Sequence, residues 1–319
     1  MIVVVTLTQL SVFVLVARLG SVKDAASALS VSEPAVSQAL TALRQHLGDQ
    51  LIVRSGAGMT LTPGGSRLLP IASQMVALGA EAEVAVRAAR GVPRQLRLVA
   101  TSTVAEFVAT PLLDAFTRRS AGAIEASSGV AAGVQMPVLV ANRLADVALG
   151  PHLASDPSLG LVSEPIFRCQ MVVVAAGRAR PRGSAAGWPW LVDPSGTDPR
   201  SDTSTLLRRL HVAEPRIRVF PNQTAAWAAA ADGAGVAPAV AHLVANQVQR
   251  GELALVETPA TPMVTNWHVT TLHRDRRPSV AGSLCHFLST PEAMQMMRSP
   301  GSGVPPSRFR PPVYVTIWS

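Results

Sequence analysis

The chain has 319 residues, of which 48% are hydrophobic and 15% are charged. This composition excludes an intrinsically disordered protein, and the length is sufficient for about two domains with well-buried cores. The net charge of +8 indicates a polyanionic partner only weakly. Residues 1–64 contain four basic and three acidic side chains and therefore contribute only +1.

The N-terminal segment is apolar enough to imitate a signal peptide. It lacks the basic first region and the small-residue cleavage site of such a peptide, and polar residues interrupt it before a membrane-spanning length is reached. Apolar residues at helical spacing over residues 7–19 instead predict a buried helix. We therefore expect a cytoplasmic protein with no membrane partner.

Two helices are predicted over residues 22–29 and 32–47, joined by a tight turn. Ser32 is a favourable N-cap residue, and Pro34 lies in the first helical turn, where its missing N–H costs little. The second helix carries one apolar stripe: Val36, Leu40, Leu43 and Leu47. This arrangement is typical of a helix-turn-helix, in which N-terminal residues of the second helix reach the base edges of DNA.

A hairpin and a long helix are predicted next. Residues 51–53 and 59–61 are two β-like runs around a Ser-Gly-Ala-Gly turn, which favours a wing. Thr62-Pro63 is a cap-plus-proline start for a helix over roughly 64–90. Its apolar strip comprises Leu68, Leu69, Ala72, Met75, Val76, Ala82 and Val86. We favour a dimerisation helix over a simple spacer.

Beyond a Gly-Val-Pro linker, strand and helix signals alternate, which predicts an α/β domain. Strands are expected at residues 96–100, 145–150, 171–177 and 188–194, and residues 225–241 read as helix, turn, short strand and helix. The last segment, 299–319, is rich in Pro, Gly and Ser, so we expect a flexible tail.

Residues 7–69 resemble the signature of LysR-type transcriptional regulators. The pieces AA-x-x-L, S-x-PAVS, LG-x-x-L, R and LT-x-x-G recur in the expected order. Farther on, ADVALG (145–150) matches the family's D-x-A-x-G strand, and GAGVAPA (233–239) loosely matches its G-x-G-V-A-x-x-P.

The resemblance implies a mixed fold: a winged helix-turn-helix, a long linker helix, and two α/β subdomains like a periplasmic binding protein, with two chain crossings near 162–165 and 265–269. It also implies double-stranded DNA, a small-molecule effector in the cleft between the subdomains, and a homodimer or homotetramer as partners. The expected domains are 1–64 for DNA binding, 65–92 for the linker helix, 93–298 for effector binding (subdomain I 93–163 and 268–298, subdomain II 164–267) and 299–319 for the tail.

The polar face of the second helix and the wing supply the candidate DNA contacts; the alternative is an ordinary solvated surface. Glu33 stands where the family usually has Gln, and it either accepts from a cytosine amino group or caps the helix dipole. Arg44 replaces a usual Glu and is expected to reach phosphate, whereas Arg54 contacts phosphate or forms a structural ion pair. The full set is Ser32, Glu33, Pro34, Ser37, Gln38, Thr41, Arg44 and Arg54.

Effector candidates lie at the carboxyl ends of strands, where ligands of open α/β sheets bind. Hydroxyls and backbone N–H groups at a helix start favour a small anion, while ordinary N-capping is the alternative. The candidates are Thr101, Ser102 and Thr103 after the first strand, then Ser195, Gly196, Thr197 and Arg200, which match the family's second effector wall, and more weakly Gly129 and Gly150.

Other functions have less support. No nucleophile elbow, P-loop, dinucleotide fingerprint or metal-ligand spacing is present, so neither an enzyme nor a cofactor is expected. The two cysteines, Cys169 and Cys285, are interpreted as reduced buried thiols; a redox switch is the alternative. The alternative function is a small-molecule-binding protein whose N-terminal region contacts another protein.

Overall fold

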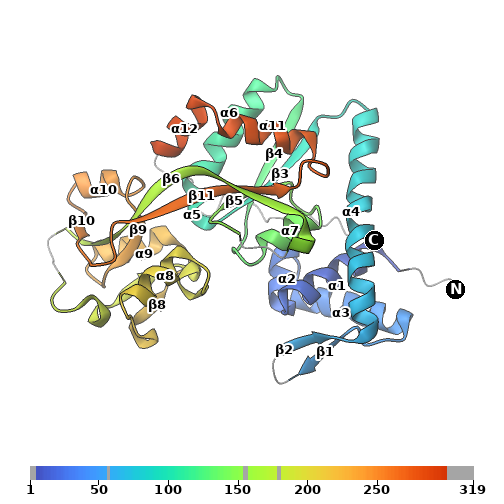
Figure 1. Ribbon diagram of the computed structural model, residues 1–319, viewed down its shortest axis with the longest axis horizontal. Coiled ribbons are helices and arrows are strands. Elements are labelled where there is room, and N and C mark those ends of the chain that lie inside the picture. The colour runs from blue at the N-terminus through green and yellow to red at the C-terminus, as the bar shows by residue number, and fades with distance from the viewer. Residues whose placement is uncertain (1–4, 56–57, 154–156, 178–180, 300–319) are drawn as a thin grey trace.

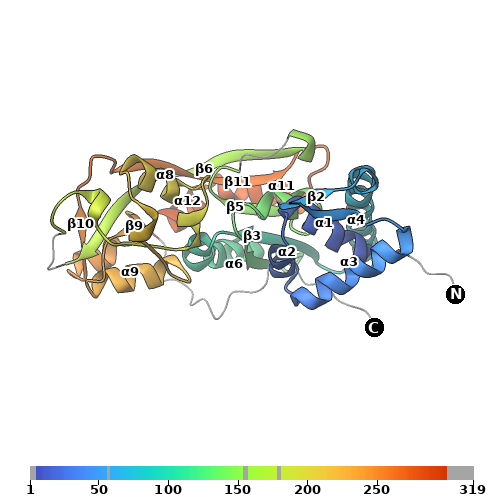
Figure 2. The same ribbon diagram turned by 90° about the horizontal axis from the view of Figure 1, so that it is seen from below.

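The computed structural model describes residues 5–55, 58–153, 157–177 and 181–299 (Figure 1). The predicted tail, apart from Ser299, lies outside these residues. The molecule is elongated, with the N-terminal helices at one end and residues of about 190–256 at the other (Figure 2). The N-terminal unit consists of α1 (Leu7–Leu19), α2 (Val22–Leu29), α3 (Glu33–Leu47), the antiparallel hairpin β1 (Ile52–Ser55) and β2 (Gly58–Leu61), and α4 (Pro63–Ala89).

Caps define the ends of the N-terminal helices. Ser21 begins α2 by accepting a hydrogen bond from the Asp24 amide at 3.1 Å, and Ser32 begins α3 by accepting one from the Ala35 amide at 3.4 Å. Between these helices Ser30 adopts a left-handed conformation with φ 56°, which makes the turn tight. The sequence-predicted helix-turn-helix is therefore present.

Helix α1 is buried on more than one face. The predicted contacts Leu10, Phe13 and Val14 are buried, and so are residues outside that stripe, such as Val12 and Leu15. Helices α2, α3 and α4 pack on α1, and α7 (Met136–Ala141) of the following domain contacts it as well. An all-round apolar helix is thus the centre of this unit.

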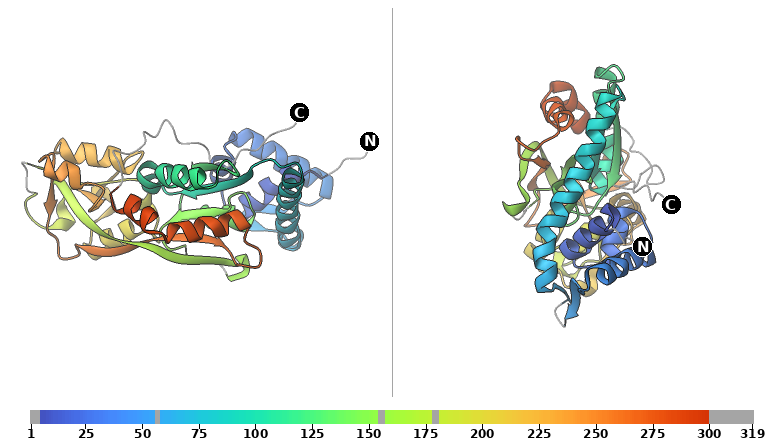
Figure 3. Two further views of the ribbon diagram at one scale, coloured as in Figure 1. Left: turned by 90° about the horizontal axis from the view of Figure 1, so that it is seen from above. Right: turned by 90° about the vertical axis from the view of Figure 1, so that its right-hand side faces the viewer.

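Helix α4 has two apolar faces rather than the single predicted strip. Ala72 and Val76 are buried against the N-terminal core, whereas Met75 is 44% and Val86 is 60% exposed. The segment 63–87 is long and apolar enough to cross a membrane by length and composition, with a mean hydropathy of 1.2. In this structure α4 packs along α1 and against the domain that follows it (Figure 3).

The rest of the chain is built on a seven-stranded sheet with the order β10-β6-β11-β5-β3-β4, and β9 pairs with β6. Strand β3 is parallel to β4 and β5, whereas β11 is antiparallel to β5 and β6. A small parallel sheet is formed by β7 (Trp190–Val192) and β8 (Ile217–Val219). The large sheet comprises β3 (Arg94–Ala100), β4 (Ile124–Val130), β5 (Val147–Gly150), β6 (Leu161–Ala176), β9 (Ala237–Val240), β10 (Leu253–Val256) and β11 (Met263–Leu272).

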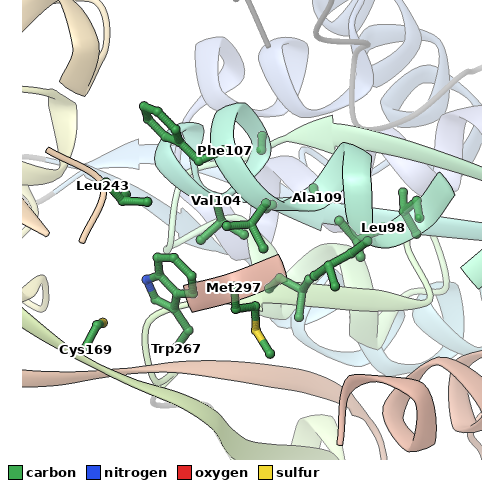
Figure 4. Packing of buried hydrophobic residues seen from close by; sticks show 14 of the residues in the cluster. Leu98, Val104, Phe107, Ala109, Cys169, Leu243, Trp267 and Met297 are labelled. Carbon is green, nitrogen blue, oxygen red and sulfur yellow. The ribbon is translucent and has the colours of Figure 1, made fainter. Parts of the chain in front are cut away.

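Helices cover these sheets. The helices are α5 (Ser102–Val104) with a π-helical turn (Ala105–Ala109), α6 (Thr110–Arg119), α7, α8 (Asp202–Arg209), α9 (Gln223–Ala231), α10 (Ala245–Gln249), α11 (Ser279–Leu288) and α12 (Pro291–Arg298). One continuous apolar cluster joins residues of β3, the helical segment after it, both long strands and α12, among them Leu98, Phe107, Cys169, Trp267 and Met297 (Figure 4).

Strands β6 and β11 form a long antiparallel ribbon through the α/β region. Their register shifts between Trp267 and His268, which pair with Phe167 and Pro165 respectively. This irregularity lies where the ribbon passes from the β5 side of the sheet to the β9 and β10 side. The expected subdomain crossings, near 162–165 and 265–269, fall within the ribbon.

The N-terminal unit and the α/β region share a hydrophobic core. Residues of α1–α3 belong to the same buried cluster as Val99, Met136 and Leu139. At the edge of this contact the Gln135 side chain, 7% exposed, donates to the Asp24 carbonyl oxygen at 3.3 Å. The helix-turn-helix is therefore packed directly on the effector-type domain.

Candidate functional site

The N-terminal half of α3 presents an exposed polar face. Ser37, Gln38 and Thr41 are all exposed, while Val36 and Leu40 on the opposite side are buried. Ser32, Glu33 and Pro34 at the start of the helix are exposed as well. Leu47, expected in the apolar stripe, is instead 42% exposed because it lies in the last turn, beyond the core.

Arg44 makes two hydrogen bonds within the chain in addition to its predicted phosphate contact. Its Nε donates to the Gln50 carbonyl oxygen at 2.7 Å, and one of its terminal nitrogens donates to the Ile52 carbonyl oxygen at 2.7 Å. The guanidinium group thus fixes the segment that leads from α3 into the wing. This gives Arg44 a positioning role, with two of its five N–H donors held by backbone carbonyls. The predicted phosphate contact stays a prediction.

The motif residues around the wing have structural roles that the spacing alone did not reveal. The Asp49 carboxylate accepts from the Leu51 amide at 2.6 Å and from the Thr62 hydroxyl at 2.8 Å. A Cβ on Gly65 would lie 2.0 Å from the Leu51 carbonyl oxygen, so only glycine fits there. These contacts fix the wing relative to α3 and α4.

The remaining candidates at this face are compatible with either of their interpretations. Arg54 is exposed on β1, opposite Met59. Glu33 lies in the first turn of α3, where a carboxylate is stabilised by the helix dipole whether or not it also meets a base.

A cavity of about 100 Å³ opens between the two parts of the α/β region. Its floor includes the long ribbon, through Met171, Thr265, Asn266 and Trp267. The other lining residues are Thr101, Thr103, Pro151, Asp193, Ser195, Ser201, Asp202, Thr203, Gln223, Pro238, Ala239 and Val240.

Three of the predicted effector residues line this cavity: Thr101, Thr103 and Ser195. Ser102 bridges it, because its hydroxyl donates to the Asp193 carboxylate at 3.4 Å. The other candidates have different surroundings. Thr197 is exposed and donates to the Pro194 carbonyl oxygen at 2.8 Å, and Arg200 is exposed on the surface.

The predicted glycines are structural. A Cβ on Gly196 would meet the Val192 side chain at 2.5 Å, and one on Gly150 would meet the Thr101 methyl group at 3.1 Å. Gly129 is a buried residue of β4, paired with Val99. These positions pack the walls behind the cavity and do not line it.

Two acidic residues of the cavity were missed by the sequence analysis. Asp193 directly follows β7 and is 6% exposed; burial raises the pKa of its carboxyl, while hydrogen bonds from Ser195 and Ser102 partly oppose this shift. Asp202 begins α8 and accepts a hydrogen bond from the Thr265 hydroxyl. The signal for Asp193 was its place at the end of a buried strand, the same criterion that selected its hydroxyl-bearing neighbours.

A second hydrogen bond also joins the two sides of the cleft. The Thr224 hydroxyl donates to Glu106 Oε1 at 2.5 Å. Glu106 is 5% exposed and its other oxygen is buried without a partner; burial raises the pKa of this carboxyl. Two acid–hydroxyl pairs therefore join the two sides of the cleft, and each side supplies one carboxyl and one hydroxyl.

The cysteines lack the features of a redox pair. Burial raises the pKa of the Cys169 thiol to about 12, with a further contribution from Asp202, so very little thiolate forms at neutral pH. Burial raises the pKa of Cys285 as well. Both are free thiols, which favours the structural interpretation.

Two family models match the chain. "Bacterial regulatory helix-turn-helix protein, lysR family" matches residues 7–66, and "LysR substrate binding domain" matches residues 89–290. The first contains α1–α3 and the wing, and the second contains every residue that lines the cleft.

Known proteins resemble the whole chain. It is 34% identical over 327 residues to the HTH-type transcriptional regulator Rv0377 of Mycobacterium tuberculosis (strain H37Rv), covering 98% of this chain and 100% of the relative. It is 28% identical over 321 residues to the HTH-type transcriptional regulator CfxR of Cupriavidus necator, covering 95% and 96%. A structure of an OxyR mutant from Corynebacterium glutamicum has the same fold, with a TM-score of 0.52 at 21% identity, over 92% of this chain and 93% of that one.

Proposed function

The chain belongs to the LysR family of transcriptional regulators, and we propose that it reads a specific double-stranded DNA site with α3 and the wing. In this proposal a small molecule held between the two α/β subdomains controls that binding. The protein acts in the cytoplasm, where its DNA is, and has no catalytic role.

The observation that supports DNA reading is the exposed face of α3. Ser37, Gln38 and Thr41 are uncovered by the rest of the chain even though α1 and α2 are packed on the effector domain. Hydroxyl and amide side chains at the N-terminal end of a recognition helix are suited to hydrogen bonds with base edges. Arg54 on the wing is the proposed phosphate contact.

The observation that supports a dimer is the exposed face of α4. Ile71, Met75 and Leu78 are 53%, 44% and 61% exposed, and Ala82 continues the series. Steps of four, three and four residues make one narrow apolar stripe, which is the pattern of two packed helices. We propose that two chains pack along this stripe, so that two copies of α3 read two half-sites.

The alternative function, in which the N-terminal unit contacts a protein, rests on the low charge of that unit. The two readings differ in a measurable way, because DNA binding releases counterions and weakens steeply with salt. Full-length protein selecting duplexes from a random pool should enrich an interrupted inverted repeat.

Variants then test the recognition face. Gln38→Ala and Thr41→Ala should each weaken binding to the selected site by about 1–3 kcal/mol while non-specific binding is unchanged. Gln45→Ala, an exposed residue at the other end of α3, is the matched control. Equal binding by all three variants and the parent protein would contradict the assignment of this face.

A further inference from the structure

The charged side chains that line the cleft are acidic, which is unfavourable for the small anion expected from its hydroxyl groups. Asp193 and Asp202 line the cavity, and among the described residues that line it there is no arginine, lysine or histidine. An anionic ligand would therefore enter a partly buried space beside two acidic groups, where like charges repel more strongly than in water.

Among the residues that the structure describes, Asp193 has only neutral hydrogen-bonding side chains around it. Its carboxylate accepts from the Ser195 hydroxyl at 2.5 Å and from the Ser102 hydroxyl at 3.4 Å, and both of these partners are neutral. A carboxylate that is 6% exposed carries a desolvation cost that neutral hydroxyls offset only in part. A cationic group placed beside it would offset the remainder.

The N-terminus of α8 carries its own carboxylate, that of Asp202, where an anionic ligand could otherwise bind. Ser201 caps α8 by accepting from the Ser204 amide at 2.9 Å, and the Asp202 carboxylate itself lies in the first turn. A carboxylate at this end of a helix interacts favourably with the dipole. The helix therefore already has its negative group, which comes from the protein and faces the cavity.

Apolar and aromatic surface completes the cavity. Trp267 and Met171 from the ribbon and Val240 from β9 line it. These side chains suit a short hydrocarbon stem.

We propose that the effector carries a positively charged ammonium or guanidinium group, which binds at Asp193 and Asp202 while its hydrocarbon part packs on Trp267 and Met171. This inference rests on the proposed function, because it names the ligand class of the same cleft. It replaces the expectation of a small anion. The two carboxylates select the ligand by charge, and the cross-cleft Ser102–Asp193 hydrogen bond places one of them at the junction of the subdomains.

Three five-carbon compounds that differ only in their end groups form the test. Cadaverine has two ammonium groups, 5-aminopentanoate has one ammonium and one carboxylate, and glutarate has two carboxylates. Binding of each to the full-length protein is measured by titration calorimetry at neutral pH and physiological ionic strength, which screens surface charges. The expected order of affinity is cadaverine, then 5-aminopentanoate, then glutarate.

Variants locate the effect. Asp193→Asn and Asp202→Asn should each weaken cadaverine binding by at least about tenfold, and Asp232→Asn, which removes an exposed carboxylate of the same charge from the end of α9, should leave it unchanged. Thermal melting of each variant verifies that it is folded. Glutarate binding as tightly as cadaverine, no preference or no binding among the three compounds, or equal effects of all three variants would each overturn the proposal.

Binding to the selected DNA site, measured on the same preparations without any ligand, distinguishes a failure of the proposed function from a failure of the proposed ligand class. Loss of specific DNA binding by the parent protein would refute the proposed regulator function even if cadaverine is preferred. Intact DNA binding without a charge preference would refute the ligand class alone.

Discussion

Leu78→Ala tests the proposed dimer along α4 most directly. Fully burying a leucine side chain contributes about 1.5–3 kcal/mol, and Leu78 is 61% exposed in the single chain. Covering that fraction is thus worth roughly 1–2 kcal/mol per copy. A two-fold interface contains both copies, so the variant should weaken dimerisation by about 2–4 kcal/mol, or roughly 30-fold to several hundred-fold.

The assay is sedimentation velocity over a concentration series, which yields the dimer dissociation constant. Val84→Ala is the matched control, because Val84 is 54% exposed but lies about 240° around the helix from Leu78. A dissociation constant for Leu78→Ala within about threefold of the control, against the roughly 30-fold minimum expected from burial, would show that the stripe is not the interface.

Three further predictions concern stability. Gly65→Ala should destabilise the fold by about 1–3 kcal/mol, because its Cβ would meet the Leu51 carbonyl oxygen; an unchanged denaturation midpoint would contradict this contact. Trp227→Ala should cost about 3–5 kcal/mol, since the ring is 1% exposed and donates to the Pro238 carbonyl oxygen at 2.9 Å; a loss below about 1 kcal/mol, far under the usual cost of such a truncation, would contradict it. Burial raises the pKa of Asp193, so the folded chain binds its proton more tightly and loses stability as pH rises from the ordinary carboxyl range through that raised pKa. Asp193→Asn should flatten this part of the pH–stability curve in urea titrations, and an unaltered curve would exclude the assigned cause.

The helix-turn-helix could be predicted from sequence because its determinants are local. The caps Ser21 and Ser32, the first-turn Pro34 and the alternation of buried and exposed positions on α3 all act within a few residues. The two backbone contacts of Arg44 could not be predicted, because its partners, the carbonyls of Gln50 and Ile52, are supplied by the path of the following segment.

Tertiary context accounts for the other differences. Strand β6 begins ten residues before the predicted start at 171, because its first part is held by the pairing with β11 and contains polar residues and Pro165 that weaken the strand pattern. The sequence predicts one apolar strip on α4 where the structure has two apolar faces, because periodicity shows the spacing of apolar residues and not which of them are covered. The two cavity carboxylates could not be predicted from the hydroxyl pattern, because Asp202 reaches the cavity only through the packing of α8 against β11.

The shared core of the helix-turn-helix and the effector domain has a thermodynamic consequence. Met136 of α7 lies behind the cleft wall, since a Cβ on Gly150 would be 3.7 Å from it and 3.1 Å from Thr101, and it belongs to the same buried cluster as α1–α3. A movement of that wall would therefore change the packing around Met136 and, through the shared core, around α1–α3. Linkage requires that whatever factor a bound effector applies to DNA affinity, bound DNA applies to effector affinity. DNA bound at α3 would therefore change the affinity of the cleft for its effector, so the concentration of small molecule to which the regulator responds would depend on the DNA site it occupies.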